Sequence, residues 1–196
     1  MKILERINQY RVILGSRSPR RQQLLKGLGI QFEVIVADDE DEYFPSDLEK
    51  VEIPVFLASR KSFLYKKYVD NNTLVITADT IVWIDNKVVG KPVNHDQAVD
   101  ILRSLSGRKH QVLTGVCLKT ISKETAFYEI SDVYFRKLVP EEIDYYVSNW
   151  KPFDKAGAYG IQEWIGYIGI EKIKGSYFNI MGLPTERLFL ELKKFV

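Results

Sequence analysis

Residues 12–25 constrain the fold of this 196-residue chain more than any other stretch. Three large apolar residues at 12–14 run together between polar flanks, which predicts a buried strand. Gly15 and a turn rich in hydroxyl groups follow. Ser18 can then cap a helix, and Pro19 suits the first helical position, where no backbone N–H is needed. The stretch therefore predicts a strand that passes through a short turn into a helix.

Three arginines crowd this turn: Arg17, Arg20 and Arg21. Free backbone N–H groups and the positive end of a helix dipole meet at the same place, so further cations oppose the dipole. Helix stability does not explain the arginines, whereas a bound anion does. The residues indicate a phosphate or polyphosphate site, with an ordinary strand–helix junction and solvated arginines as the alternative. The turn is not a P-loop, because no Gly-Lys-Ser/Thr sequence closes it.

The rest of the chain alternates strands and helices before a stretch rich in hairpins. The sequence predicts strands at 12–14, 31–37, 73–78, 110–121 and 125–136, a hairpin over 81–89 and an extended segment at 165–173. It predicts helices that begin at Pro19, at Pro54, near Asn94, at Pro140 and after Pro184. This order favours an α/β fold with a mixed sheet and flanking helices over a purely parallel sheet. The length allows one domain, or one domain with two lobes.

Charge and composition exclude several classes of protein. The net charge of +2 and the absence of a long basic block argue against general nucleic-acid binding. One cysteine, Cys117, forms no internal disulfide, and two histidines are too few for a structural zinc site. No apolar run approaches the ~20 residues of a membrane span, and the first residues lack the apolar core of a signal peptide. A cytoplasmic protein is expected.

Among single residues, Asp79 is the strongest candidate for a catalytic or ligand-binding role. It is expected where the buried strand at 73–78 ends, and open α/β sheets expose ligand-facing groups at such points. A carboxylate beside a buried strand is costly unless it is paired or bound to a metal. Thr80 beside it can donate or accept a hydrogen bond. An aspartate that merely forms a turn is the alternative.

Cations recur at turn and loop positions throughout the chain. They are Arg17, Arg20, Arg21, Lys61, Lys91 and Lys155. Each alone is typical of a surface charge. Together with Asp79 and the acidic run at 38–42, they describe a cleft for a phosphorylated ligand and a divalent cation, because phosphate attracts charge-assisted donors and carboxylates hold the metal.

Six blocks of the chain carry a resemblance to a known family. They are Gly-Ser-Arg-Ser-Pro-Arg-Arg-Gln-Gln-Leu-Leu at 15–25, Ala-Asp-Thr at 78–80, Gly-Lys-Pro at 90–92, residues 105–116, Asp-Lys-Ala-Gly-Ala-Tyr-Gly-Ile-Gln at 154–162 and Met-Gly-Leu-Pro at 181–184. In this order they resemble the Maf family of nucleoside triphosphate pyrophosphatases. One block would be weak evidence, but six in order along nearly the whole chain are specific.

The resemblance implies hydrolysis of dTTP and UTP between the α- and β-phosphates, which gives the nucleoside monophosphate and pyrophosphate. It implies one domain over residues 1–196, with a strongly twisted mixed sheet and two lobes around a central cleft, related to the inosine triphosphate pyrophosphatases. The expected cofactor is a divalent cation: Mg²⁺, Mn²⁺ or Co²⁺. The expected partner is the nucleotide substrate, with no membrane and no nucleic acid, and a homodimer is left open.

The resemblance also assigns roles to residues. Asp79 is the expected general base, and it is also a candidate metal ligand with Glu40 and Asp41. The expected phosphate-binding residues are Ser16, Arg20, Arg21, Lys61 and Lys91. The positions that separate the dTTP/UTP branch from the branch acting on 7-methyl-GTP are Arg20, Thr80 and Gln162.

The chain departs from the family pattern in three places. Lys151 stands where the family often has Glu, Glu163 and Trp164 follow Gln162 where Gly is usual after the Gln, and the stretch before Gly175 is one residue longer. These positions surround the base-recognition segment, so they bear on the choice of base rather than on the reaction. The alternatives are a house-cleaning pyrophosphatase for modified nucleotides, and a nucleic-acid-binding or cell-division regulator that uses the arginine cluster.

Overall fold

The structure is a computed structural model that describes residues 2–37 and 43–196. The chain divides into two compact units, which are described separately. The first unit comprises Met1–Asp79, Thr114–Glu129 and Gly182–Val196. The second comprises Thr80–Leu113 and Ile130–Met181.

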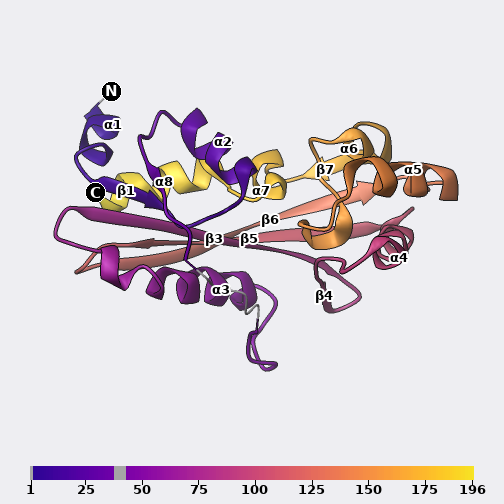
Figure 1. The fold of residues 1–196 in the computed structure, drawn as a ribbon, viewed down its shortest axis with the longest axis horizontal. Coiled ribbons are helices and arrows are strands. Elements are labelled where there is room, and N and C mark those ends of the chain that lie inside the picture. The colour runs from indigo at the N-terminus through magenta and orange to yellow at the C-terminus, as the bar shows by residue number, and fades with distance from the viewer. Residues whose placement is uncertain (1, 38–42) are drawn as a thin grey trace. The chain divides into compact units, whose positions relative to one another are not determined.

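Helices and strands alternate along the chain (Figure 1). The α-helices of the described residues are α1 (Lys2–Ile7), α2 (Pro19–Gly27), α3 (Glu52–Phe63), α4 (His95–Leu105), α5 (Pro140–Trp150), α6 (Trp164–Gly169), α7 (Tyr177–Met181) and α8 (Thr185–Phe195). Two 3-10 helices are η1 (Lys66–Tyr68) and η2 (Ala156–Ala158). The strands are β1 (Arg11–Leu14), β2 (Glu33–Val34), β3 (Thr73–Ile84), β4 (Lys87–Val89), β5 (Lys109–Lys119), β6 (Glu124–Phe135) and β7 (Ile170–Lys174).

The strands of the described residues form one seven-stranded sheet in the order β2-β1-β3-β5-β6-β7, with β4 paired to β3. β1 runs parallel to both β2 and β3, whereas β4 pairs antiparallel with β3 and β7 pairs antiparallel with β6. The sheet is therefore mixed. This confirms the α/β class that the alternation of strands and helices predicts.

The first unit begins with the predicted strand, turn and helix. The side chain of Ser18 caps α2 by accepting from the backbone N–H of Arg21 at 3.5 Å. Gly29, two residues beyond the helix end, has a φ of +76°, a conformation that favours glycine. Within this unit α2 and α8 lie on one face of the strands and α3 on the other (Figure 1).

Close packing fixes α3 against the strands of the first unit. A Cβ on Gly115 of β5 would lie 2.2 Å from the carbonyl oxygen of Pro54, so only glycine lets the helix come this near. The hydroxyl of Thr77 on β3 donates to the carbonyl of Ala58 at 2.7 Å. These contacts hold the last turns of α3, which include Lys61, beside the middle of β3.

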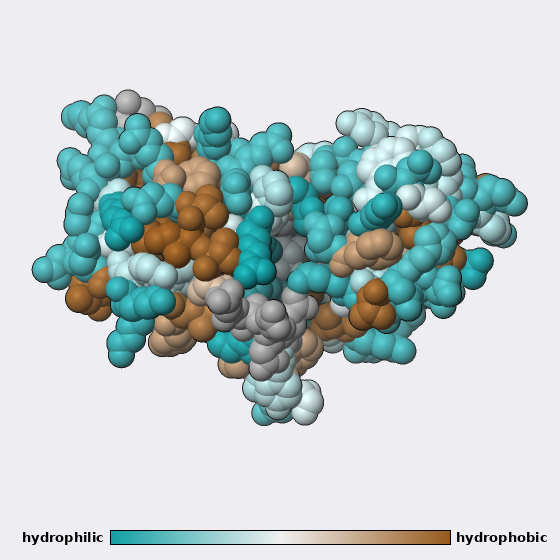
Figure 2. Space-filling model, in the orientation of Figure 1, coloured by the Kyte–Doolittle hydropathy of each residue, from teal (hydrophilic) through white to brown (hydrophobic). Residues whose placement is uncertain are grey.

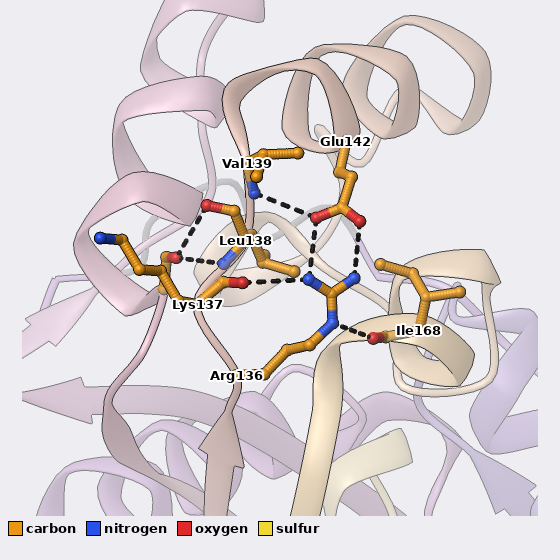
Figure 3. A network of polar contacts seen from close by, with 7 residues as sticks. Arg136, Lys137, Leu138, Val139, Glu142 and Ile168 are labelled. Atoms are coloured by element: carbon orange, nitrogen blue, oxygen red, sulfur yellow. Dashed lines mark hydrogen bonds and ion pairs between the residues drawn. The ribbon is translucent and has the colours of Figure 1, made fainter.

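An arginine joins three segments of the second unit (Figure 3). The guanidinium of Arg136 makes two bonds to the carboxylate of Glu142, at 2.7 and 3.0 Å, and its Nε donates to the carbonyl of Ile168 at 2.6 Å. Glu142 also accepts from the backbone N–H of Val139 at 3.0 Å, which caps the start of α5. The hydrogen bond from Arg136 lowers the pKa of Glu142. The network therefore ties the end of β6 to the start of α5 and the end of α6.

A buried histidine lies in the core of the second unit. Nε2 of His110 is 2.8 Å from the hydroxyl oxygen of Tyr159, and the rings of Phe135 and Tyr159 meet the imidazole edge-on. Nδ1 has no hydrogen-bond partner among the described residues, so an imidazolium would bury an unpaired donor there. Burial lowers the pKa of His110 from 6.5 to about 4.

We expect the free energy of unfolding to fall as the pH drops from about 6.5 towards 4. In this range the unfolded chain binds a proton at His110 and the folded chain does not, so acid favours unfolding. The contribution is about 3 kcal/mol at most. Urea unfolding between pH 7 and 5 should show a flatter pH dependence for His110→Phe than for the wild type. An unchanged slope in His110→Phe would contradict the expectation.

Three sequence predictions were wrong in their detail. β3 runs unbroken through Asp79 to Ile84, because the run of β-branched and aromatic residues continues beyond the aspartate. Residues 165–169 form most of α6 rather than an extended segment, and β7 begins only at Ile170. The strand predicted at 31–37 is reduced to the two residues of β2.

Hydrophilic side chains predominate on the face of the molecule drawn in Figure 2, and apolar side chains gather there in a few places. Within residues 2–37 and 43–196, none of the helices has the length and the apolar character that a membrane span requires.

Candidate active site

The candidate active site of the first unit is built on an ion pair between α3 and β3. Nζ of Lys61 lies 2.5 Å from Oδ1 of Asp79. The side chains are 21% and 11% exposed, respectively, so the pair is largely withdrawn from solvent. A carboxylate in such a place needs a partner, and Lys61 supplies it. The sequence predicted both residues but gave no sign that they touch.

Asp79 lies within β3 between two stretches of strand pairing. β1 pairs with residues 73–76, and β4 pairs with residues 82–84. The aspartate is thus held by a continuous strand on both sides, with its backbone fixed in the extended conformation. The strand positions the carboxylate more rigidly than the predicted strand end would.

The turn after β1 presents a hydroxyl and an arginine side by side. Oγ of Ser16 accepts from the backbone N–H of Ser18 at 3.2 Å and from Nη1 of Arg21 at 3.4 Å. Nε of Arg21 donates to the carbonyl of Gly182 at 2.8 Å. Arg21 therefore ties the start of α2 to the segment that leads into α8, a contact that the sequence did not reveal. Arg20, beside it on the first turn of α2, is half-buried.

The other predicted residues belong to the second unit. Thr80 is half-buried on β3, and Lys91 is exposed after β4. The loop that carries Lys91 is tied to η2, because the N–H of Gly157 donates to the carbonyl of Gly90 at 3.1 Å. Oε1 of Gln162 is buried and has no hydrogen-bond partner among the described residues.

Sequence reasoning missed a network around Gln162. Nζ of Lys155 pairs with Glu163 at 3.1 Å and with Asp154 at 2.7 Å. The hydroxyl of Tyr146 donates to Glu163 and accepts from the backbone N–H of Gly160 at 3.0 Å. The sequence signals were Lys155 among the recurring cations and the departure from the family pattern at Glu163.

The donor set of the described residues suits a cation that is shared with a substrate. Glu40 and Asp41, two of the three expected metal ligands, lie outside the described residues. Among the residues that are described, no group of three or more His, Cys, Asp or Glu side chains could hold a metal ion by itself. Mg²⁺ is usually bound by one or two carboxylates together with substrate phosphates. Asp79 fits that role as a single carboxylate.

The two units carry different kinds of polar group. The first unit combines a buried carboxylate, a lysine and a turn with a serine hydroxyl and arginines, which suits a negatively charged, phosphorylated ligand. The second unit holds a buried amide oxygen, Oε1 of Gln162, that has no hydrogen-bond partner among the described residues. The features of the first unit are typical of an α/β protein that binds a phosphorylated small molecule.

Comparison with known proteins gives the family. The sequence model of the family described as "Maf-like protein" matches residues 11–195. A "dTTP/UTP pyrophosphatase" of Phocaeicola vulgatus is 52% identical over 192 residues, covering 98% of this chain and all of the relative. A protein of the same name from Bacteroides thetaiotaomicron matches at the same identity and coverage. The chain belongs to the Maf-like family.

Solved structures show a more distant likeness. A HAM1 protein from Coxiella burnetii is 11% identical and gives a TM-score of 0.48, covering 94% of this chain and 99% of that chain.

Proposed function

We propose that this chain hydrolyses dTTP and UTP to the nucleoside monophosphate and pyrophosphate. The observation that carries the proposal is the match at 52% identity to relatives of that name, over 98% of this chain and 100% of theirs. The six blocks are distributed over both units. Asp79, which pairs with Lys61, belongs to one of these blocks and lies in the first unit. One domain over residues 1–196 with two lobes around a cleft, a cytoplasmic location and a homodimer remain predictions.

In the proposed mechanism Asp79 is the general base. Water attacks the α-phosphorus and forms a new P–O bond, the bond between the α-phosphorus and the oxygen bridging to the β-phosphate breaks, and pyrophosphate leaves. The carboxylate of Asp79 takes the proton that the water loses. Lys61, at 2.5 Å from this carboxylate, holds it in place and can balance negative charge on the phosphates.

The phosphates would be bound by cations and hydroxyls from the predicted set: Ser16, Arg20, Arg21, Lys61 and Lys91. Arg21 is already held by Ser16 and by the carbonyl of Gly182, so we propose that it shapes the turn and adds positive charge there. A divalent cation held by Asp79 and the substrate phosphates would supply further charge neutralisation and activation of water. Glu40 and Asp41 remain predicted ligands.

The base would be selected by Arg20, Thr80 and Gln162. Uracil and thymine present an N–H group between two carbonyl oxygens. The amide of Gln162 can accept from that N–H through Oε1 and donate to a neighbouring carbonyl through Nε2. Oε1 is buried and has no partner among the described residues, so the amide would turn to present it to the base and would gain a partner there.

A pyrophosphate-release screen over standard and modified triphosphates tests the function. With Mg²⁺, Mn²⁺ or Co²⁺ present, we expect kcat/KM for dTTP and UTP to exceed that for ATP, GTP and 7-methyl-GTP at least tenfold, and EDTA to abolish release. Inorganic phosphate should not be the first product. Release from modified nucleotides alone would establish the house-cleaning alternative, and salt-dependent binding of single strands without any hydrolysis would establish the regulatory one.

A further inference from the structure

The turn that carries Gln162 is closed by the residue that follows it. The backbone N–H of Glu163 donates to the carbonyl of Gly160 at 3.0 Å. Glu163 also precedes the first residue of α6, and its own carbonyl accepts from the N–H of Gly166 at 2.9 Å. Glu163 therefore joins the turn to the helix, with Gln162 held between them.

The carboxylate of Glu163 is anchored at both oxygens. Oε1 lies 3.1 Å from Nζ of Lys155, and Oε2 accepts from the hydroxyl of Tyr146. The side chains of Lys155 and Glu163 are only 9% and 18% exposed. The same Tyr146 oxygen accepts from the N–H of Gly160 at 3.0 Å. Glu163 is thus connected through Tyr146 to the first residue of its own turn.

Gly160 shows how closely these groups pack. A Cβ at this position would lie 2.7 Å from Cδ of Glu163 and 3.0 Å from Nε2 of Gln162. The carboxylate of Glu163 and the amide of Gln162 therefore both pack against the α-carbon of Gly160. A change in the position of the Glu163 side chain alters the space available to the Gln162 amide.

The two helices beside this turn, α5 and α6, are held together by Arg136. Arg136 binds Glu142 on α5 and the carbonyl of Ile168 on α6, as Figure 3 shows. Tyr146 lies on α5 and Glu163 immediately before α6. Burial, and then the hydrogen bond to Glu163, raise the pKa of Tyr146, so its phenol remains a neutral donor to the carboxylate.

We infer that Glu163 is a positioning residue for recognition of the base. Its carboxylate, held by Lys155 and Tyr146, sets the turn from Gly160 and with it the direction of the Gln162 amide. The inference rests on the proposed function, since it assigns to Glu163 a part in the selection of uracil and thymine. It also gives a reason for glutamate at a position where the resemblance leads one to expect glycine.

Two substitutions test the inference by steady-state kinetics with UTP. Glu163→Gly removes both anchors, and we expect KM to rise at least tenfold while kcat stays within threefold. Glu163→Gln keeps an acceptor for Tyr146 and loses the charge that faces Lys155, so its KM should rise about threefold. Glu141→Gln, at an exposed carboxylate on the first turn of α5, is the matched control and should leave both constants unchanged.

Inorganic triphosphate, which has no base, separates positioning from general damage. Its inhibition constant against UTP should be the same in the wild type, both Glu163 variants and the control. A rise in this constant equal to the rise in KM would overturn the inference, because the phosphate site would then be affected as well. A fall in kcat with unchanged KM would also overturn it.

Hydrogen exchange provides a readout that needs no substrate. The amide of Gly160 should exchange at least tenfold faster in Glu163→Gly than in the wild type, with Glu163→Gln between them. Unchanged exchange would overturn the inference whatever the kinetics show. A wild type that does not hydrolyse UTP would overturn the proposed function alone, and the exchange rates would still decide whether Glu163 orders the turn.

Discussion

Asp79→Asn should lower kcat for UTP hydrolysis by about 10²–10⁴, the usual contribution of a general base. The amide has nearly the shape of the carboxylate but does not take a proton from water. Its ammonium neighbour, Lys61, is 21% exposed and can turn towards solvent, so the variant should remain folded. Pyrophosphate release under saturating UTP measures the change, and urea unfolding checks the fold.

The matched control for this substitution is Asp85→Asn. Asp85 follows β3 in the turn to β4, its carboxylate is 55% exposed, and its φ of +51° is a conformation that asparagine accepts. It pairs with Arg108 at 2.5 Å and has no role in the proposed chemistry. Activity should therefore be unchanged. If Asp79→Asn hydrolyses UTP at nearly the wild-type rate, Asp79 is not the base.

Lys61→Met should lower kcat/KM for UTP at least a hundredfold. The substitution removes a cation from the expected phosphate site and leaves the carboxylate of Asp79, which is 11% exposed, without its ammonium partner. Leaving a mostly buried carboxylate unpaired costs about 1–3 kcal/mol, so the free energy of unfolding should fall by a similar amount. Lys61→Arg keeps the charge and should recover part of both losses.

The double variant Lys61→Met/Asp79→Asn tests whether the two side chains act together. If Lys61 stabilises the protein through Asp79, the double variant should be about as stable as Asp79→Asn alone, and the two changes will not add. Urea unfolding of the four proteins gives the coupling free energy. Lys119→Met, which breaks a similar 2.5 Å pair with Glu124, controls for the loss of a lysine elsewhere in the first unit. If the two substitutions lower the free energy of unfolding by strictly additive amounts, the contact between Lys61 and Asp79 does not stabilise the protein.

Local signals in the sequence predict much of this fold. Ser18 and Pro19 mark the start of α2, Asn94 caps α4 by accepting from Gln97, and the helix predicted from Pro140 is α5. In each case the signal and the structure it specifies lie within a few residues. The mixed sheet follows from the order of these elements.

The predictions that were wrong depend on contacts far apart in the sequence. Residues 165–169 are apolar enough for a strand, yet they form α6, whose end is bound by Arg136 from β6. Asp79 was expected at the end of its strand, where a carboxylate is costly unless it is paired or bound to a metal. Lys61, eighteen positions away along the chain, pairs with it and allows β3 to continue.

The same distinction between local signals and distant contacts applies to the candidate site. Lys61 lies outside the six blocks and was named as one of the recurring cations, whereas the types of residue at Ser16, Asp79 and Gln162 could be read from the blocks. The bonds of Arg21 to Gly182 and of Glu163 to Lys155 and Tyr146 could not, because no pattern in a single sequence records which distant side chains meet.

The continuous course of β3 through Asp79 has a consequence for how such enzymes diversify. Successive side chains of a strand point to opposite faces, so Asp79 shares a face with Thr77, and both meet α3 through Lys61 and Ala58. Thr80, next in the sequence, points to the opposite face. With the roles proposed above, a substitution at residue 80 is expected to change the preferred nucleotide while the proposed base, Asp79, and its partner Lys61 keep their surroundings. The proposed catalytic and selective roles would then fall on neighbouring residues whose side chains lie on opposite sides of the sheet.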